Sequence, residues 1–186
     1  MEFLTPEGLM AGLDHIRQAP RDVGEVAAIV RRPAVDEREL VTEAHLDFAN
    51  GVVGDTWLIR GSTSTPDGSS AVDKQVTVMN VRVAELVAGG RERMTLAGDQ
   101  LYVDFDLSIE NLPPGRVIQV GAAMLEVSEA PHLGCAKFVA RFGADAMRFV
   151  NSAEGRQMRL RGANMRVLTP GIVRVGDAVS ATVPPS

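Results

Sequence analysis

Two similar stretches decide the expected fold: residues 170–177 read Pro-Gly-Ile-Val-Arg-Val-Gly-Asp, and residues 114–121 read Pro-Gly-Arg-Val-Ile-Gln-Val-Gly. In each, a Pro-Gly turn leads into a short run of β-branched residues that ends at glycine, which indicates a strand bounded by turns. Two such units far apart in the chain are typical of short strands folded into a barrel. We therefore expect a mostly β fold with short helices, of the α+β class.

Other segments have the composition of strands. Residues 23–30, 74–79 and 101–107 are rich in β-branched and apolar residues or alternate polar with apolar ones, and residues 122–127 form an apolar run. Residues 158–161 also alternate, with Met and Leu between two arginines, and predict one more strand.

Helix signals occur before and between these strands. Thr5 followed by Pro6 predicts a helix start, and Leu9, Leu13 and Ile16 then recur at helical spacing. Asn80 predicts the cap of a short helix that ends before Gly89-Gly90. We therefore expect one domain over residues 1–186, with a helical extension over 1–23 and a barrel core over 24–183.

A small helical cluster is expected after residue 135. Phe138 and Phe142 fall on one face of a helix that Gly143 should end, and residues 147–150 indicate a second helix. Residues 151–154 read Asn-Ser-Ala-Glu, which resembles a capping box for one further turn.

The composition limits the classes of protein. The chain has 186 residues, of which 45% are hydrophobic and 23% charged, as in an ordinary soluble domain. Its acidic N-terminal residues do not resemble a signal peptide, and no apolar run is long enough to cross a membrane. Cys135 is the single cysteine and has no partner for an internal disulfide. We expect a cytoplasmic protein without a membrane partner.

The charge is unevenly distributed. The net charge of −5 argues against nucleic-acid binding, yet eight basic residues stand against two acidic ones between Ala136 and Gly176. These basic side chains either lie on solvent-exposed faces of helices and strands or form a site for an anionic small molecule. The polar residues 61–73 predict a loop, which either lies idle on the surface or covers a site.

Cys135 is the strongest candidate for chemistry. The chain has no phosphate-binding Gly-rich loop, no dinucleotide motif, no metalloprotease helix and no nucleophile elbow. His132-x-x-Cys135 has ligand-like spacing, but a structural zinc site needs four ligands. Cys135 directly precedes an expected helix, whose N-terminus, with Lys137, Arg141 and His132, favours the thiolate. The thiolate is a nucleophile and a soft-metal ligand; the alternative is a buried, inert cysteine.

Five motifs in a fixed order carry a resemblance to a known family. They are residues 51–55 (Gly-Val-Val-Gly-Asp), 74–79 (Lys-Gln-Val-Thr-Val-Met), 98–101 (Gly-Asp-Gln-Leu), 111–121 before the cysteine loop, and 134–138 (Gly-Cys-Ala-Lys-Phe) continuing to 161–177. Together they resemble the MOSC domain, named for the C-terminal domain of molybdenum cofactor sulfurases. The resemblance spans roughly residues 24–183.

This resemblance implies a β-barrel in which the cysteine carries sulfur as a persulfide or coordinates the molybdenum of a pterin cofactor. The cofactor is anionic through its phosphate, and arginines bind phosphate by bidentate hydrogen bonds. Its implied binding residues are Gly54, Asp55, Lys74, Arg156, Arg159, Arg161 and Arg166. A sulfur-donor protein or an electron-donating protein is the implied partner.

The chain departs from the family pattern at two places. Thr56 and Trp57 stand where members usually have a basic residue and then His, and Gly134 stands where Pro commonly precedes the cysteine. The chain also lacks the pyridoxal-phosphate transferase domain of the sulfurases, so that cofactor is not expected on this chain itself. It lacks the extra N-terminal β domain of the molybdenum-containing amidoxime reductases as well. We expect a stand-alone member.

Three functions follow. The first is a sulfur carrier or molybdenum-pterin-handling protein that acts through Cys135. The second is a molybdenum-dependent reductase of N-hydroxylated compounds, and the third is a non-catalytic binding scaffold with a buried cysteine. An enzyme of this kind would be a sulfur transferase or a molybdenum-dependent oxidoreductase; the sequence leaves open whether the chain is one.

Overall fold

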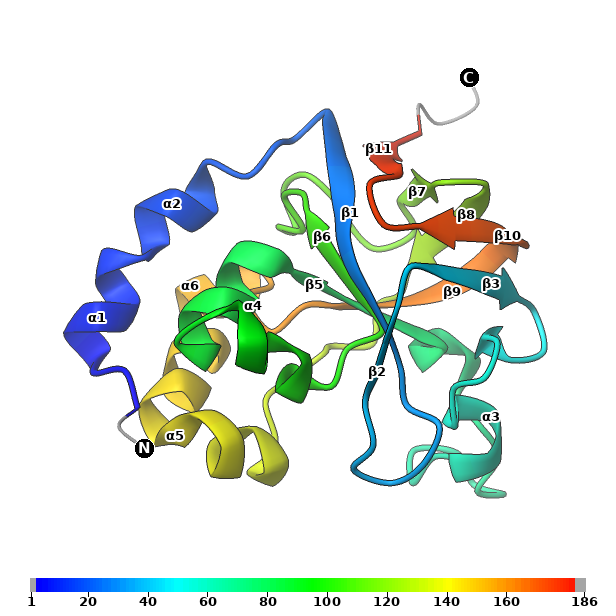
Figure 1. Cartoon of the computed structure of the whole chain (residues 1–186), viewed down its shortest axis with the longest axis horizontal. Coiled ribbons are helices and arrows are strands. Elements are labelled where there is room, and N and C mark those ends of the chain that lie inside the picture. Colours follow the sequence, from blue (N-terminus) through cyan, green and yellow to red (C-terminus); the bar gives the residue numbers. More distant parts are fainter. Residues whose placement is uncertain (1–2, 183–186) are drawn as a thin grey trace.

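The computed structural model describes residues 3–182 and centres on a closed β-barrel (Figure 1). Within these residues, seven strands close the barrel in the order β1-β11-β7-β8-β9-β5-β6 and back to β1. The strands are β1 (Val23–Arg31), β5 (Val76–Asn80), β6 (Leu101–Asp104), β7 (Val117–Val120), β8 (Ala123–Val127), β9 (Ala163–Thr169) and β11 (Ala178–Ala181). β5 and β6 are parallel, and every other neighbouring pair is antiparallel. The prediction of a mostly β, barrel-like fold is confirmed.

Four further strands lie outside this ring. β2 (Glu39–Val41) pairs with the far end of β1, while β3 (Glu43–Asp47), β4 (Gly51–Val52) and β10 (Gly171–Arg174) form a small sheet in the order β10-β3-β4. Pro114-Gly115 forms the expected turn before β7, whereas Pro170 alone joins β9 to β10 and Gly171 is already the first residue of β10. Of the expected barrel limits, residue 24 lies in β1, and residue 183 lies outside the described residues.

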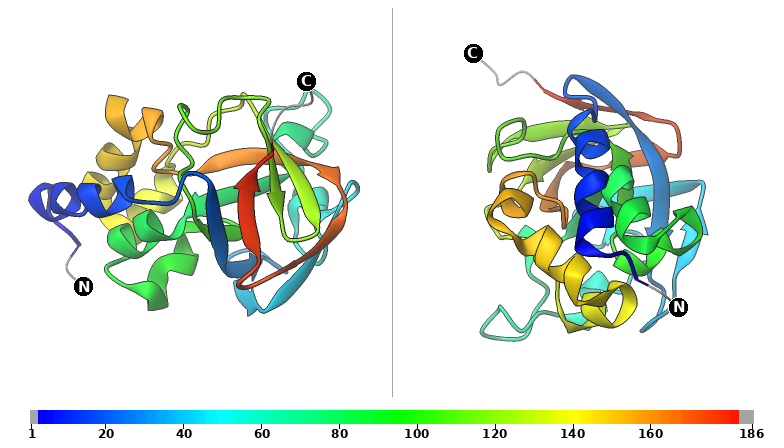
Figure 2. Two further views of the ribbon diagram at one scale, coloured as in Figure 1. Left: turned by 90° about the horizontal axis from the view of Figure 1, so that it is seen from above. Right: turned by 90° about the vertical axis from the view of Figure 1, so that its left-hand side faces the viewer.

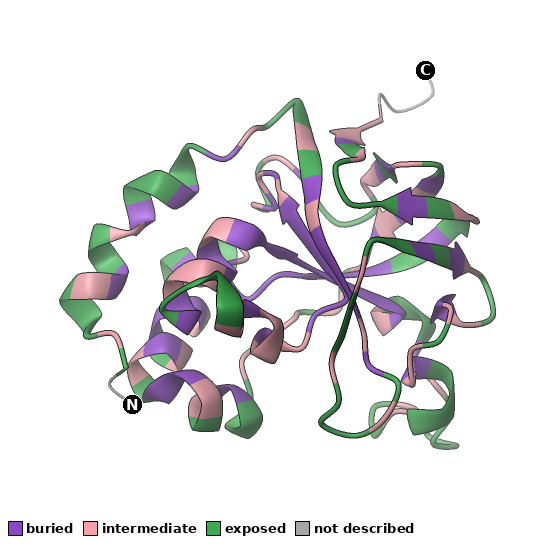
Figure 3. Ribbon diagram, viewed as in Figure 1, coloured by how far each residue is buried: buried purple, intermediate pink, exposed green. Residues whose placement is uncertain are grey.

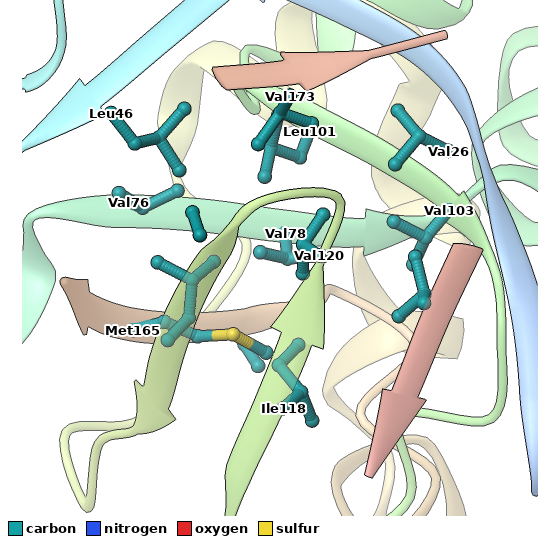
Figure 4. Packing of buried hydrophobic residues seen from close by; sticks show 14 of the residues in the cluster. Val26, Leu46, Val76, Val78, Leu101, Val103, Ile118, Val120, Met165 and Val173 are labelled. Atoms are coloured by element: carbon teal, nitrogen blue, oxygen red, sulfur yellow. The ribbon is translucent and has the colours of Figure 1, made fainter. Parts of the chain in front are cut away.

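Three barrel strands, β1, β5 and β6, bury side chains on both faces. Val26 and Ile29 point into the barrel with residues from the other strands, whereas Val30 packs outward against helices. Figure 4 shows this interior, where aliphatic side chains from opposite walls meet. Figure 3 shows the same distribution, with buried residues along the strands and on the helix faces that meet them. Each fully buried aliphatic side chain stabilises the fold by about 1.5–3 kcal/mol.

Most of the helices gather on one side of the barrel (Figure 2). They are α1 (Pro6–Ala11), α2 (Leu13–Arg17), α4 (Val81–Ala88), α5 (Ala136–Asn151) and α6 (Ala153–Gln157), with the 3-10 helix η2 (Arg91–Ala97). Thr5 caps α1 and Asn80 caps α4, as predicted, while Gly12 divides the expected N-terminal helix in two. A second apolar cluster joins these helices to the outer face of β1, β5 and β6.

The segment after Cys135 forms the expected helical cluster. Phe138 and Phe142 are buried, and Gly143 breaks α5 with a φ of 88°, a value that favours glycine. Ser152 caps α6 through a hydrogen bond from the Gly155 amide.

The predicted strand over 158–161 is wrong. These residues form a turn, in which Arg159 has a φ of 48° and the Leu160 amide bonds back to the Gly155 carbonyl. Leu160 is buried in the helical cluster, so packing there outweighs the alternating pattern, and β9 begins only at Ala163.

The remaining elements lie beyond the small sheet. α3 (Trp57–Arg60) follows β4, and the loop over 61–71 leads to the 3-10 helix η1 (Val72–Lys74). Ser70 donates hydrogen bonds to the carbonyls of Trp57 and Leu58, which ties the loop to α3. None of the helices described between residues 3 and 182 combines the length and apolarity needed to cross a membrane.

Candidate functional site

Cys135 is an exposed free thiol at the N-terminal end of α5. Its carbonyl accepts hydrogen bonds from the Phe138 and Val139 amides and so starts the helix. Gly134 packs so closely on α5 that an added Cβ would lie 2.5 Å from Met147 Sδ, and its amide donates to Asn151 Oδ1 over 3.1 Å. Proline has no N–H for this bond, which accounts for glycine here. The alternative of a buried cysteine is wrong.

Cys135 borders a cleft of about 790 Å³ whose lining is strongly basic. Seven Arg or Lys side chains line the cleft against one acidic side chain, Asp36. The basic residues are Arg32, Arg38, Arg60, Lys74, Lys137, Arg141 and Arg161. Lys137 and Arg141, which sequence reasoning placed near the thiol, are thus part of this lining. A small anion with several negative charges matches such a cleft.

The first of two buried carboxylates, Asp55, holds Arg32. Its Oδ2 accepts from Arg32 Nε and its Oδ1 from Nη2, each over 2.7 Å. Arg32 Nη1 donates to the Gly98 carbonyl over 2.9 Å. Because this planar pair is bidentate and buried, the Arg32 guanidinium is fixed in the cleft wall.

The second carboxylate, Asp99, holds Arg161 in the same way. Arg161 Nη1 donates to Asp99 Oδ2 over 2.7 Å, and Nη2 donates to the Ala97 carbonyl over 2.9 Å. Asp99 Oδ1 lies 2.8 Å from His132 Nε2. The segment 97–100 therefore anchors two arginines of the cleft as well as the histidine that precedes the cysteine.

These contacts shift the pKa values of Asp99 and His132. Burial alone would raise the pKa of Asp99, but Arg161 together with His132 holds it below the ordinary value of 3.8. Burial and then Arg161 lower the pKa of His132 from 6.5, so its imidazole is neutral at pH 7 and Nε2–H donates to Asp99. The positive charge expected from His132 is therefore absent, and lysine and arginine provide the charge of the cleft.

Two of the basic side chains in the cleft, Arg38 and Arg60, have no acidic partner among residues 3–182. Asp36 binds Lys137 and Arg141, each over 3.0 Å, and Lys137 lowers the pKa of this carboxyl. Within residues 3–182, neither Arg38 nor Arg60 forms an ion pair, and Arg38 Nε is buried without a hydrogen bond. Burial, followed by neighbouring arginines, lowers the pKa of both guanidinium groups. This uncompensated charge favours an anion in the cleft.

The predicted cofactor-binding residues separate in space. Lys74 and Arg161 line the cleft, Asp55 lies beneath it, and Gly54 adopts a φ of 87° beside Arg31.

The other three predicted arginines lie elsewhere. Arg156 and Arg159 line a second cavity, which also borders Arg161. Arg166 pairs with Glu126 between β9 and β8, and it lines neither space.

Sequence reasoning missed Arg32, Arg38 and Arg60. Arg32 follows directly on β1, and Arg60 ends α3, three residues after Trp57. Trp57 itself is buried, and its amide donates to Asp55 Oδ1, so its role is packing. One sequence signal could have identified Arg32: it is a basic residue just after a predicted strand and before the Gly-x-x-Gly-Asp motif. None of residues 61–73 lines the cleft.

The protein offers few metal ligands. Over the described residues, 3–182, no three His, Cys, Asp or Glu side chains gather into a group that could hold a metal ion. A metal at Cys135 would therefore take its other ligands from a bound cofactor or from water.

Known proteins share this fold. A family model described as MOSC domain matches residues 69–180. The YUAD protein from Bacillus subtilis gives a TM-score of 0.64 at 14% identity, covering 86% of this chain and 95% of that chain. YiiM from Escherichia coli gives a TM-score of 0.55 at 16% identity, covering 87% of this chain and 71% of that chain. No curated protein matches the sequence at a significant level.

Proposed function

This chain belongs to the MOSC domain family, and we propose that it acts through Cys135, carrying sulfur as a persulfide or coordinating the molybdenum of an anionic pterin cofactor. The observation that carries the proposal is the exposed thiol on the rim of a cleft with seven basic side chains. A cysteine at a helix N-terminus that shares its cleft with Lys137 and Arg141 is suited to both roles.

The residues of the cleft fit an anionic pterin. Arg38 and Arg60 lack acidic partners within residues 3–182, and buried Nε atoms of Arg38 and Arg161 lack hydrogen-bond partners. These groups would hold the phosphate of the cofactor, and Cys135 would supply a sulfur ligand to its metal. When bound, the molybdenum centre would supply two-electron transfer. The protein would bind, orient and partly screen this group.

The sulfur-carrier role needs no metal. The Cys135 thiolate would attack the outer sulfur of a donor persulfide, the donor S–S bond would break, and the donor would leave as a thiolate. The products are a Cys135 persulfide and the reduced donor thiol, without net oxidation. The basic lining would stabilise both the attacking thiolate and the persulfide anion that forms.

Mass spectrometry under mild, non-reducing conditions tests the sulfur role. After incubation with a persulfide donor, the wild-type protein should carry one added sulfur at Cys135. Since Cys135 is the single cysteine, the Cys135→Ser variant contains no thiol and serves as the negative control. Arg148→Ala removes an exposed arginine that lines neither cavity and should keep the modification.

Metal analysis tests the molybdenum role. Protein made in a host that synthesises the cofactor should contain molybdenum, and Cys135→Ser should lose it. Arg60→Gln should retain less of the cofactor than Arg148→Gln, because only Arg60 lines the cleft. Absence of both molybdenum and persulfide sulfur in the wild-type protein would contradict the proposal.

A reductase of N-hydroxylated compounds is the second candidate, favoured by the same capacity for an anionic cofactor. It requires bound molybdenum and an electron-donating partner, so it fails if the metal analysis finds none. The remaining alternative is a binding scaffold; the exposure of Cys135 removes its premise of a buried cysteine.

A further inference from the structure

A second cavity, of about 220 Å³, lies next to the loop that leads to Cys135. It lies between residues 128–133, helix α6 and the start of β9. It shares five lining residues with the cleft: Pro131, His132, Leu133, Arg161 and Asn164. Asn164 fixes this shared wall by donating to the carbonyls of Ala130 and Pro131.

Most of the cavity wall is apolar. Its apolar lining residues are Ile109, Pro114, Ala130, Pro131, Leu133, Val150 and Ala163. The volume is below that of usual drug-sized ligand pockets, so the cavity accommodates a single small ring rather than a nucleotide or a pterin.

Several polar groups of this cavity are free to bind a ligand. Arg156 and Arg159 form no ion pair within residues 3–182, and the only hydrogen bond that the Arg156 side chain donates there runs from Nε to the Asn151 carbonyl. The planar end of Arg156 is thus free for a carboxylate. Arg161 is 6% exposed, and its Nε has no hydrogen-bond partner; the same holds for the buried Oγ of Ser128.

One acidic residue narrows the choice of ligand. Glu129 also lines the cavity and is exposed without an ion pair among the described residues. Its charge opposes a dianion such as phosphate more than a single carboxylate. Arg156 and Arg159 outnumber Glu129 among the unpaired charges of this apolar cavity, so the balance favours a monoanion.

We propose that this cavity binds a small monocarboxylate with one apolar ring, with its carboxylate on Arg156 and its ring among the apolar residues. The proposal does not depend on sulfur or molybdenum at Cys135, because Cys135 lines the cleft and not this cavity. The ligand is a substrate fragment or an effector, and from this cavity it contacts the residues that the cavity shares with the cleft.

Benzoate is the probe, added to the full-length protein labelled with nitrogen-15. The amide resonances of Ser128, Ala130, Gly155 and Ala163 should shift and saturate, whereas those of Gly98 and Lys74 in the cleft should move little. Benzamide has the same ring without the charge, so it should bind about tenfold more weakly.

Three variants sharpen the test. Arg156→Ala should weaken benzoate binding about tenfold, and Ala130→Leu, which fills the cavity without lining the cleft, should abolish it. Arg148→Ala removes an equally exposed arginine from the same helical cluster and should leave affinity unchanged. If Ala130→Leu does not fold, the test rests on the amide resonance shifts of the wild-type protein and on the benzoate affinity of Arg156→Ala. A lack of saturation, shifts centred on Gly98 and Lys74, or full affinity in Arg156→Ala would overturn the proposal.

Discussion

Asp99 and Arg161 are both buried and form an ion pair of 2.7 Å beneath the cleft that Cys135 borders. The other oxygen of the same carboxylate binds His132. One acidic side chain therefore fixes two groups in the wall between the cleft and the second cavity. A second buried pair, Asp55–Arg32, contacts the same segment through the bond from Arg32 Nη1 to the Gly98 carbonyl.

Asp99→Asn should destabilise the protein by about 3–5 kcal/mol, because Arg161 would remain buried without its counter-charge. Urea unfolding at pH 7 measures this change. Asp145→Asn is the matched control, since Asp145 pairs with Arg148 at the surface, where such pairs contribute about 0–1 kcal/mol. Equal effects of the two substitutions would contradict the role assigned to Asp99.

Stability should fall with acidification in two separate windows. The pKa of His132 in the folded protein lies below 6.5 and that of Asp99 lies below 3.8, so the unfolded chain binds more protons in both cases. The loss attributable to His132 begins as the pH falls below about 6.5, and that attributable to Asp99 as it falls below about 3.8.

Unfolding free energies measured across pH separate the two groups. His132→Gln keeps an N–H donor for Asp99 and should flatten the first window alone, whereas Asp99→Asn should flatten the second. His15→Gln changes an exposed histidine and should leave both slopes in place. A profile in which His132→Gln and the wild type coincide between pH 4 and 6.5 would exclude this account of the histidine.

The sequence predicted most of the fold because local signals and packing agree there. Thr5 and Asn80 cap the helices they were expected to cap, α6 starts at the predicted capping segment 151–154 with Ser152 as its cap, and Gly143 interrupts α5 where a helix end was expected. Residues 158–161 failed because Leu160 is buried against helices rather than in a sheet. Alternation alone does not say which surface an apolar side chain meets.

The site was only partly predictable for a related reason. Cys135, Lys137 and Arg141 are close in sequence, so their neighbourhood followed from one helix start. Arg32 and Arg60 come from distant segments and reach the cleft only through barrel closure and the anchoring by Asp55. The separation of Arg156 and Arg159 from the cleft likewise depends on the path of the loop at 128–134, which the charge pattern did not specify.

Arg60→Gln should weaken binding of inorganic phosphate about threefold to tenfold while leaving stability unchanged or slightly higher. Arg60 has no acidic partner within residues 3–182 and is repelled by Arg32, so folding gains nothing from its charge. Calorimetric titration at low salt, with Arg148→Gln as control, measures the affinity. Unchanged phosphate affinity would show that Arg60 does not contribute to an anion site.

Cys135 should react with iodoacetamide in the folded protein without denaturant, since the thiol is exposed. Arg141→Ala should slow the reaction, because it removes a positive charge from the same cleft, and Arg148→Ala should not. Peptide mass analysis over time gives the rates. A thiol that reacts only after unfolding would contradict its placement on the cleft rim.

The central claim is that Cys135 is the attachment point for sulfur or molybdenum. Native mass spectrometry of protein made in a cofactor-competent host, with and without a persulfide donor, tests it most directly. The account predicts an added sulfur or a bound molybdenum pterin on the wild-type protein, and neither on Cys135→Ser. A wild-type protein that carries neither, or a Cys135→Ser variant that retains the same adduct, would contradict it.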